Sequence, residues 1–186
     1  LAEQLQLVGE VVSTWMTCQL LWCELSEIFC AGDIQRQLPT EFQQFKAVDS
    51  AYRTQTNAVA AEPSVLPWMS LPQRECTLLA TLSKGVATLE QVKFSASQFL
   101  MTKRAMFARL YFVSDAALFR LYAGCDSADA LRSHVRTVMP ALQHIDITVD
   151  DRNTTAILAV GDGMGDVLHL SRACLVGRCP ELWLEQ

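Results

Sequence analysis

The segment 154–170, TTAILAVGDGMGDVLHL, decides between two folds for this chain. Its apolar run predicts a β-strand, and the loop that follows holds Gly161, Gly163 and Gly165. A nucleotide-binding fold would need a helix after these glycines, because the amide groups at a helix N-terminus bind the phosphates. The next residues, DVLHLSR, alternate with a period of two instead, which is typical of a second strand. We therefore predict a β-hairpin whose turn contains the three glycines.

Two aspartates of the same segment also disfavour a phosphate site. Asp166 stands where a dinucleotide fingerprint needs its third glycine, and Asp162 lies between the first two glycines. Their carboxylates would repel a phosphate at close range. No Lys-Ser or Lys-Thr pair follows the glycines, so the P-loop pattern is absent as well. Cation binding by the two carboxylates is a third interpretation, but calcium loops need more oxygen ligands, and a solvated acidic turn is expected.

Upstream of the hairpin, the sequence has the periodicity of long helices. Apolar residues recur at every third or fourth position from Leu5 to Phe29, which predicts one long helix with a broad buried face. Thr40 and Gln43 form a capping-box pattern at the start of a second helix. The buried faces of the second helix and of a third, long helix are expected to contain Phe42, Phe45, Val48, Tyr52 and Val59, and then Leu79, Leu82, Val86, Leu89, Val92, Ala96 and Phe99.

The pattern changes towards the C-terminus. Ser114 is expected to cap a short helix, another helix follows it, and after Pro140 three short segments have the character of strands. The prediction is a mainly α fold of long packed helices with a small antiparallel β-hairpin or sheet near the C-terminus. The expected parts are a helical subdomain at 1–143, a small β element at 144–174 and a terminal helix at 175–186.

The composition argues against several classes of function. The chain is 51% hydrophobic and 19% charged, which is typical of a globular protein without a disordered tail. A net charge of −5 without any Lys/Arg-rich run argues against a nucleic-acid surface. No apolar stretch reaches the length that spans a membrane, so no membrane partner is expected. The chain begins with Leu1 and not with Met, and we expect it to be a piece of a longer protein.

Local motifs support neither metal binding nor catalysis. The seven cysteines contain no CxxC pair, and the three histidines lack the spacing of metal ligands. The cysteines are expected to be reduced and to pack as small apolar residues. No GxSxG elbow is present, although a Cys–His pair that meets only in space stays open. We expect no catalytic residue, no metal and no cofactor in this chain.

Aromatic and basic residues gather in the segment 102–122. Lys103, Arg104 and Arg109 form either a docking surface for an acidic partner or a helix end near its negative dipole, and the sequence leaves both open. The aromatic residues lack the basic surround of a stacking platform, so they are expected in the core. The aromatic residues expected to face inward are Phe107, Tyr111, Phe112, Phe119 and Tyr122, together with Trp15, Trp22 and Trp183.

Five blocks in residues 10–186 carry a resemblance to a known family. WMTCQLLWCELSEIF with DIQRQLPTEFQQFKAVDSAY looks like its Trp-containing helix, connection and next helix. The second block, FLMTKRAMFARLYFVSDAALFRL, is similar to its Lys-Arg, Phe-Pro-Arg and Phe-(Leu/Val)-Ser run and to the short helix after it. The third block, SHVRTVMPALQHIDI, resembles the next helix. AILAVGDGMGDVLHL resembles a hairpin with Gly-Glu at its turn, and GRCPELWL a closing Gly-x-Val-Glu-x-Trp-Leu segment. In this order the blocks resemble the C-terminal part of the linker region of the dynein heavy chain.

The chain departs from the family pattern at Ala108, Tyr52 and Asp166, where proline, tryptophan and glutamate are usual. It is therefore identified as a divergent member, and DIQRQLP and the Val-Asp pair are closer to the axonemal branch. The resemblance implies a mechanical lever that couples ATP hydrolysis in a ring of AAA+ modules to movement towards the microtubule minus end.

The resemblance also implies partners, location and residue roles. ATP and Mg would be bound by the ring, so this segment itself would not be an enzyme. Its partners would be the ring of the same heavy chain and, through the parent, light chains, intermediate chains and microtubules. Its location would be the cytoplasm and cytoskeleton, with the axoneme of a cilium or flagellum favoured. A stand-alone helical interaction or scaffold domain is the alternative, and a nucleotide-binding enzyme is a weaker one. The residues expected to serve the lever are Trp15, Trp22, Phe29, Phe107, Arg109, Phe112 and Trp183.

Overall fold

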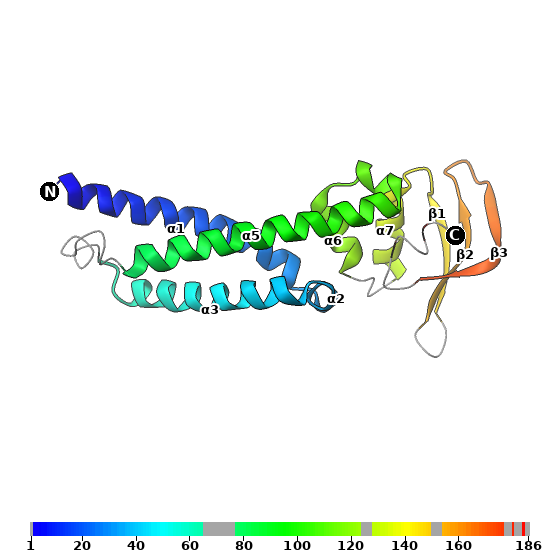
Figure 1. The fold of residues 1–186 in the computed structure, drawn as a ribbon. Coiled ribbons are helices and arrows are strands. Elements are labelled where there is room, and N and C mark those ends of the chain that lie inside the picture. The colour runs from blue at the N-terminus through cyan, green and yellow to red at the C-terminus, as the bar shows by residue number, and fades with distance from the viewer. Residues whose placement is uncertain are drawn as a thin grey trace. The chain divides into compact units, whose positions relative to one another are not determined.

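A computed structural model describes residues 2–64, 77–123, 128–149, 154–176, 180 and 184. The chain divides into two compact units. The helical unit comprises Leu1–Cys30 and Gln37–Ala96, and the mixed unit comprises Ala31–Arg36 and Ser97–Gln186. The expected mainly α fold with a small antiparallel sheet is confirmed (Figure 1).

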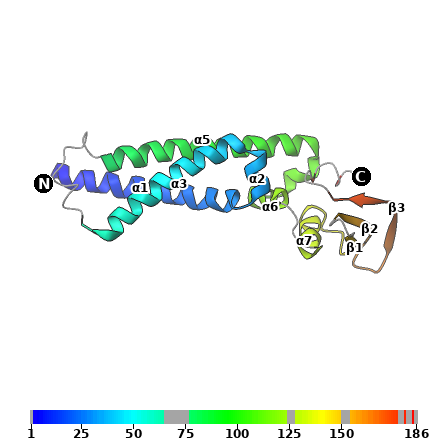
Figure 2. The same cartoon turned by 90° about the horizontal axis from the view of Figure 1, so that it is seen from below.

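Three long helices lie side by side in the helical unit, as the two views in Figures 1 and 2 show. They are α1 (Ala2–Phe29), α3 (Pro39–Ala61) and the first part of α5 (Thr77–Met106). Successive buried residues on α1 are four or seven positions apart, which places them on one face of a helix. The buried residues of α1 and α3 are Leu7, Val11, Cys18, Leu25, Phe29, Phe45 and Tyr52.

The start of α3 differs from the predicted capping box. Leu38 occupies the N-cap position without a side-chain hydrogen bond, and Pro39 stands in the first turn. The Phe42 amide donates to the Leu38 carbonyl at 2.9 Å. Proline is well suited to the first helical position because its fixed φ and missing N–H cost nothing there. The Thr40–Gln43 prediction is therefore wrong by two residues, since the helix begins before Thr40.

Helix α5 is continuous from Thr77 to Met106, through Gly85 and through the basic residues Lys103 and Arg104. A short 3₁₀ helix, η2 (Ala108–Phe112), follows it. Then come α6 (Asp115–Tyr122), which Ser114 caps as predicted by accepting from the Ala117 amide, and α7 (Ala128–Val138). A six-residue helix, α2 (Gly32–Gln37), stands where only a connection was expected. The most deeply buried apolar residues of the mixed unit are Ile34, Leu100, Leu110, Leu118, Tyr122 and Leu131.

The sheet is antiparallel with strand order β1-β2-β3. Its strands are β1 (His144–Val149), β2 (Thr155–Gly161) and β3 (Val167–Leu175). In the register of both pairs, Val160 lies opposite Ile145 on one side and Leu168 on the other. A bulge interrupts the pairing of β1 with β2, because Asp146 lies opposite Ala159 and the next residue, Ile147, lies opposite Ile157. Leu158 is therefore left without a partner in β1, and its side chain is exposed. Of the predicted terminal helix, the structure describes only Leu175, Val176, Pro180 and Leu184.

The glycine-rich loop is the turn of the β2–β3 hairpin, as predicted. Asp162 closes it, because its carboxylate oxygen Oδ1 accepts from the amides of Met164, Gly165 and Asp166 at 2.9, 3.1 and 3.1 Å. Gly165 has a φ of +101°, a conformation that L side chains rarely adopt. The turn amides are thus already satisfied by a carboxylate of the chain itself, which leaves no cradle for a phosphate.

Gly161 meets a second requirement of the hairpin, the close approach of two backbone segments. A Cβ atom at this position would lie 2.7 Å from the Asp166 carbonyl oxygen and 3.2 Å from the His144 Cβ. At Gly163 the space is wider, with the Gln143 Cγ at 3.4 Å. Gly161 and Gly165 therefore have a steric reason to be glycine, whereas Gly163 has no reason of comparable strength.

None of the helices that the structure describes has the length and apolar character needed to cross a membrane. The described residues also contain no group of three His, Cys, Asp or Glu side chains placed to hold a metal ion.

Candidate functional site

The face between α1 and α3 holds an aromatic seam, formed by Trp15, Trp22, Asp49, Tyr52 and Arg53. The rings of Trp22 and Tyr52 stack with centroids 5.4 Å apart, and Trp15 meets Tyr52 edge-on at 6.4 Å. Trp15 Nε1 donates to the Tyr52 hydroxyl at 3.2 Å. Such aromatic pairs contribute about 0.5–1.5 kcal/mol beyond the area they bury. The seam therefore fixes the register of α1 against α3.

Asp49 joins the polar edge of the seam. Its Oδ1 accepts from Trp22 Nε1 and from Arg53 Nε, both at 2.8 Å. The Arg53 guanidinium also lies over the Trp22 ring, 5.1 Å from its centroid. A carboxylate that accepts from an indole and a guanidinium at once restricts both side chains. Asp49 and Arg53 did not emerge as site residues from the sequence, since their partner Trp22 lies on another helix.

Phe29 forms a second aromatic contact at the C-terminal end of α1. Its ring lies 5.3 Å from that of Phe45 and 5.8 Å from that of Phe42, measured between centroids. Phe29 is 3% exposed. Trp15 and Trp22 are half-buried and Phe29 is buried, and all three rings contact aromatic rings of α3.

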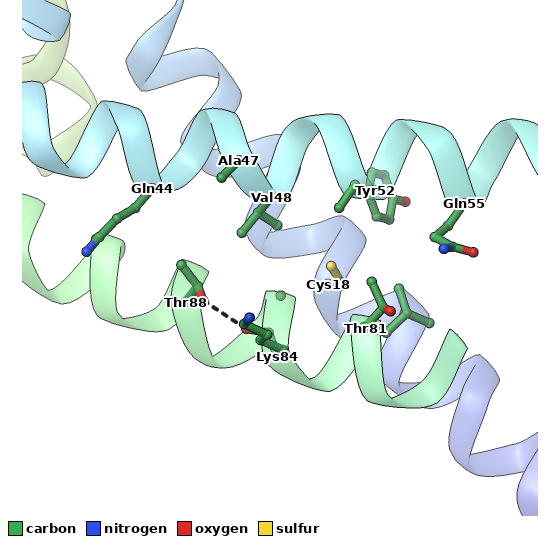
Figure 3. Close-up of a pocket in the computed structure, with 12 residues that line it drawn as sticks. Cys18, Gln44, Ala47, Val48, Tyr52, Gln55, Thr81, Lys84 and Thr88 are labelled. Atoms are coloured by element: carbon green, nitrogen blue, oxygen red, sulfur yellow. Dashed lines mark hydrogen bonds between the residues drawn. The ribbon is translucent and has the colours of Figure 1, made fainter. Parts of the chain in front are cut away.

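A groove of about 400 Å³ opens between α3 and α5, with Cys18 of α1 at its floor (Figure 3). Figure 3 shows Val48 and Tyr52 entering it from α3, opposite Thr81 and Thr88 on α5. Burial raises the pKa of the Cys18 thiol, so this sulfur stays protonated and is a poor nucleophile. The thiol at the floor of the groove is therefore not a reactive group.

Gly85 creates part of this groove, and we expect Gly85→Ala to stabilise the chain by about 0.5–1 kcal/mol. An added Cβ would lie 3.4 Å from Val48 Cγ1 and 3.6 Å from Cys18 Sγ, which is ordinary van der Waals contact. Urea unfolding measures the effect. Gly9→Ala is the matched control, since Gly9 is also in a helix. A Cβ added at Gly9 would have no atom within 4 Å, so this substitution gains helix propensity alone. A destabilising Gly85→Ala would show that the helices cannot accept the methyl group.

A junction around Arg104 links the end of α5 to η2 and α6. The Arg104 side chain is only 12% exposed. It donates to the carbonyls of Leu110 at 3.2 Å and Val113 at 2.8 Å, and to Asp115 Oδ1 at 2.7 Å. One guanidinium thereby holds two turns of irregular backbone and the first residue of α6. The sequence showed Arg104 only as one of three cations, because its acceptors are backbone groups that no motif reveals.

Lys103 also makes its contacts within the mixed unit. Its ammonium lies 5.3 Å from the centroid of the Phe99 ring and 5.4 Å from that of Tyr122. Arg109, in contrast, is exposed and makes no ion pair or hydrogen bond with any described residue. Of these three cations, Arg109 is therefore available to a docking surface for an acidic partner, whereas Lys103 and Arg104 already have structural partners.

Two residues of the predicted aromatic core are exposed, which corrects that prediction. Phe112 is 92% exposed and Tyr111 is 54% exposed, whereas Phe119 and Tyr122 are buried as expected and Phe107 is half-buried. The cause is the tight turn of η2, in which the fully buried Leu110 faces the core and the next two residues do not. Trp183, the remaining predicted residue, lies outside the described residues.

The titratable side chains give no sign of catalysis among the described residues. Burial raises the pKa of the Cys174 thiol. Burial, and after it the positive charge of Arg120, lowers the pKa of His134. Both groups are thus neutral near pH 7.

The whole chain, residues 1–186, matches the family described as "Dynein heavy chain, N-terminal region 2". It is similar to dynein axonemal heavy chain 6 of Homo sapiens, with 31% identity over 79% of this chain. It is also similar to dynein axonemal heavy chain 5 of Rattus norvegicus, 26% identical over 94%, and to the cytoplasmic dynein heavy chain of Dictyostelium discoideum, 25% identical over 98%. The matched segment spans 3% to 5% of the length of these relatives.

Proposed function

This chain belongs to the dynein heavy chain family, as part of its N-terminal region 2, and on that premise we propose that it is a mechanical linker segment of a motor. The resemblance seen in the sequence blocks is thereby confirmed at the level of the family. The proposed role is to couple ATP hydrolysis in an AAA+ ring of the parent chain to minus-end-directed movement along microtubules.

The observation that carries this proposal is the continuous packing of the helical unit. Three long helices share a core in which Val11, Leu25, Leu89 and Val92 are completely buried. The aromatic seam adds hydrogen bonds and ring contacts between α1 and α3. Interiors of this density have low compressibility and transmit strain, which is what a lever requires.

We place ATP and Mg in the ring of the parent chain and not in this segment. The glycine loop, the feature most similar to a nucleotide site, is closed by the Asp162 carboxylate. The proposed partners are the ring itself and, through the parent, light chains, intermediate chains and microtubules. The proposed parts are a helical subdomain at 1–143, a β element at 144–174, and a terminal helix at 175–186 that leads to the first ring module.

The exposed residues of η2 are the proposed contact with that module. Phe112 is 92% exposed, and Arg109 beside it is a free cation among the described residues. Phe107, which precedes η2, is half-buried, and we assign Trp183 to the same contact by resemblance. The aromatic residues Trp15, Trp22 and Phe29 are proposed to stiffen the lever.

We propose the axoneme of a cilium or flagellum as the location within the cytoskeleton. The relative with 31% identity is axonemal, and the cytoplasmic relative of Dictyostelium discoideum is 25% identical. A fluorescent fusion of the parent, expressed in ciliated cells, tests this location. We expect signal along the axoneme, and signal confined to the cell body would contradict the proposal.

The coding sequence beyond the codon for Gln186 tests the motor proposal. A strand, a GxxxxGK[ST] loop and a helix are expected within a few dozen codons, because the first nucleotide-binding module of the ring would begin there. Unrelated sequence or a stop codon would contradict the proposal. That outcome would favour a stand-alone interaction domain, to which the exposed Phe112 and Met164 would also be suited.

A further inference from the structure

Helix α7 carries a polar hollow that the lever function does not use. The hollow measures about 440 Å³ and is lined by Asp129, Arg132, Ser133, Arg136 and Thr137, which we call the α7 hollow. These positions are spaced by three, four, seven and eight residues from the first, so they share one face of the helix. The other face of α7 is buried through Leu131, Val135 and Val138.

The two arginines of the hollow are held in place by backbone carbonyls. Arg132 Nε donates to the Ile145 carbonyl at 3.3 Å, and Arg136 Nη2 donates to the Gln143 carbonyl. Both acceptors lie at or just before β1, which follows α7 in the same unit (Figure 1). A carbonyl orients a guanidinium without neutralising it, and after these bonds both side chains still have further N–H groups to donate.

The remaining residues add one hydroxyl donor and one carboxylate. Thr137 Oγ1 donates to the Ser133 carbonyl at 2.9 Å, whereas the Ser133 hydroxyl makes no hydrogen bond with any residue that the structure describes. Asp129 Oδ1 accepts from Arg132 Nη1 at 2.8 Å, but its side chain is 93% exposed. An ion pair as exposed to water as this one contributes at most about 1 kcal/mol, so a better anion can displace the Asp129 carboxylate.

The charges around the hollow favour an anion. Two guanidinium groups face one carboxylate within it. His134 is neutral near pH 7 and contributes no charge. This positive site stands out in a chain whose net charge is −5.

We propose that the α7 hollow binds a phosphoryl group. A phosphoryl dianion has three terminal oxygens, enough to accept from the forks of Arg132 and Arg136 and from the Ser133 hydroxyl together. A planar carboxylate has one charge and two oxygens in a single plane, so it is a weaker match for three donor groups that approach from different directions. The arginines are already fixed by the β1 segment, so little side-chain entropy is lost on binding. This inference does not depend on the motor proposal.

The isotope-labelled 186-residue chain is titrated in low salt with inorganic phosphate, and separately with a phosphoserine peptide, while its NMR spectrum is recorded. Shifts of the Nε–H signals of Arg132 and Arg136 are expected with both, and acetate at equal ionic strength should produce much weaker ones. Binding of phosphate but not of the peptide would assign the site to the free ion. Arg136→Gln should weaken phosphate binding by about tenfold, as expected for one charge-assisted contact.

A second variant keeps the test valid if Arg136→Gln unsettles the fold. Asp129→Asn removes the competing carboxylate from an exposed position, and we expect it to tighten phosphate binding about threefold. Arg172→Gln, at an exposed position of β3, is the matched control and should change nothing. The proposal is wrong if phosphate and acetate act alike, or if Asp129→Asn leaves the affinity for phosphate unchanged.

Discussion

Arg104→Met should lower the free energy of unfolding of this chain by about 2–4 kcal/mol. The substitution keeps much of the apolar stem but removes the donors to the Leu110 and Val113 carbonyls and to Asp115. The Arg104 side chain is 12% exposed, so water cannot fully replace those bonds. Urea denaturation gives the total loss, and amide hydrogen exchange at Leu118, the first full turn of α6, should show its location.

Arg109→Met is the matched control for that experiment. Arg109 lies five residues further along, in η2, but it is exposed and has no partner among the described residues, so a change within about 0.5 kcal/mol is expected. Equal losses in the two variants would mean that the junction does not depend on the buried guanidinium.

Trp22→Ala should be the second large effect, again a loss of about 2–4 kcal/mol. It removes the stack on Tyr52 and the hydrogen bond to Asp49, and it leaves Arg53 without the ring beneath it. Trp22→Phe keeps a stacking ring and loses only the indole N–H, so about 1–2 kcal/mol is expected for it.

Leu20→Ala is the control for Trp22→Ala, because Leu20 lies two residues away on α1 and is 71% exposed. Its effect on unfolding should be small. If Leu20→Ala and Trp22→Ala were equally costly, the aromatic seam would not be what holds α1 against α3. Thermal unfolding of both variants, followed by Trp fluorescence and by circular dichroism, measures the two losses of stability.

The sequence predicted those parts of the fold that depend on local pattern. The spacing of Val11, Cys18, Leu25 and Phe29 is visible without any partner helix, and so is the alternation after Gly165. The start of α3 was predicted two residues late, because a capping-box pattern competes with Pro39, and proline is preferred in a first turn.

The candidate sites were harder to predict because they join residues through space. Arg104 binds carbonyls of an irregular segment, and carbonyls are present at every position of a sequence. Asp49 meets Trp22 across two helices. Phe112 was expected inside, since an aromatic residue in an apolar run usually is, but the geometry of η2 exposes 92% of it. Tertiary packing decided these outcomes, and local propensity does not contain it.

Microtubule gliding by the parent heavy chain tests the central proposal, that this segment is a lever, most directly. Trp22→Ala, which weakens the α1–α3 contact without touching the proposed ring contact, is compared with Leu20→Ala. The account predicts that Trp22→Ala slows gliding clearly while ATP hydrolysis without microtubules continues, and that Leu20→Ala leaves both unchanged. Unchanged gliding velocity in the Trp22→Ala motor, at a temperature where the unfolding measurements show the contact to be lost, would contradict it.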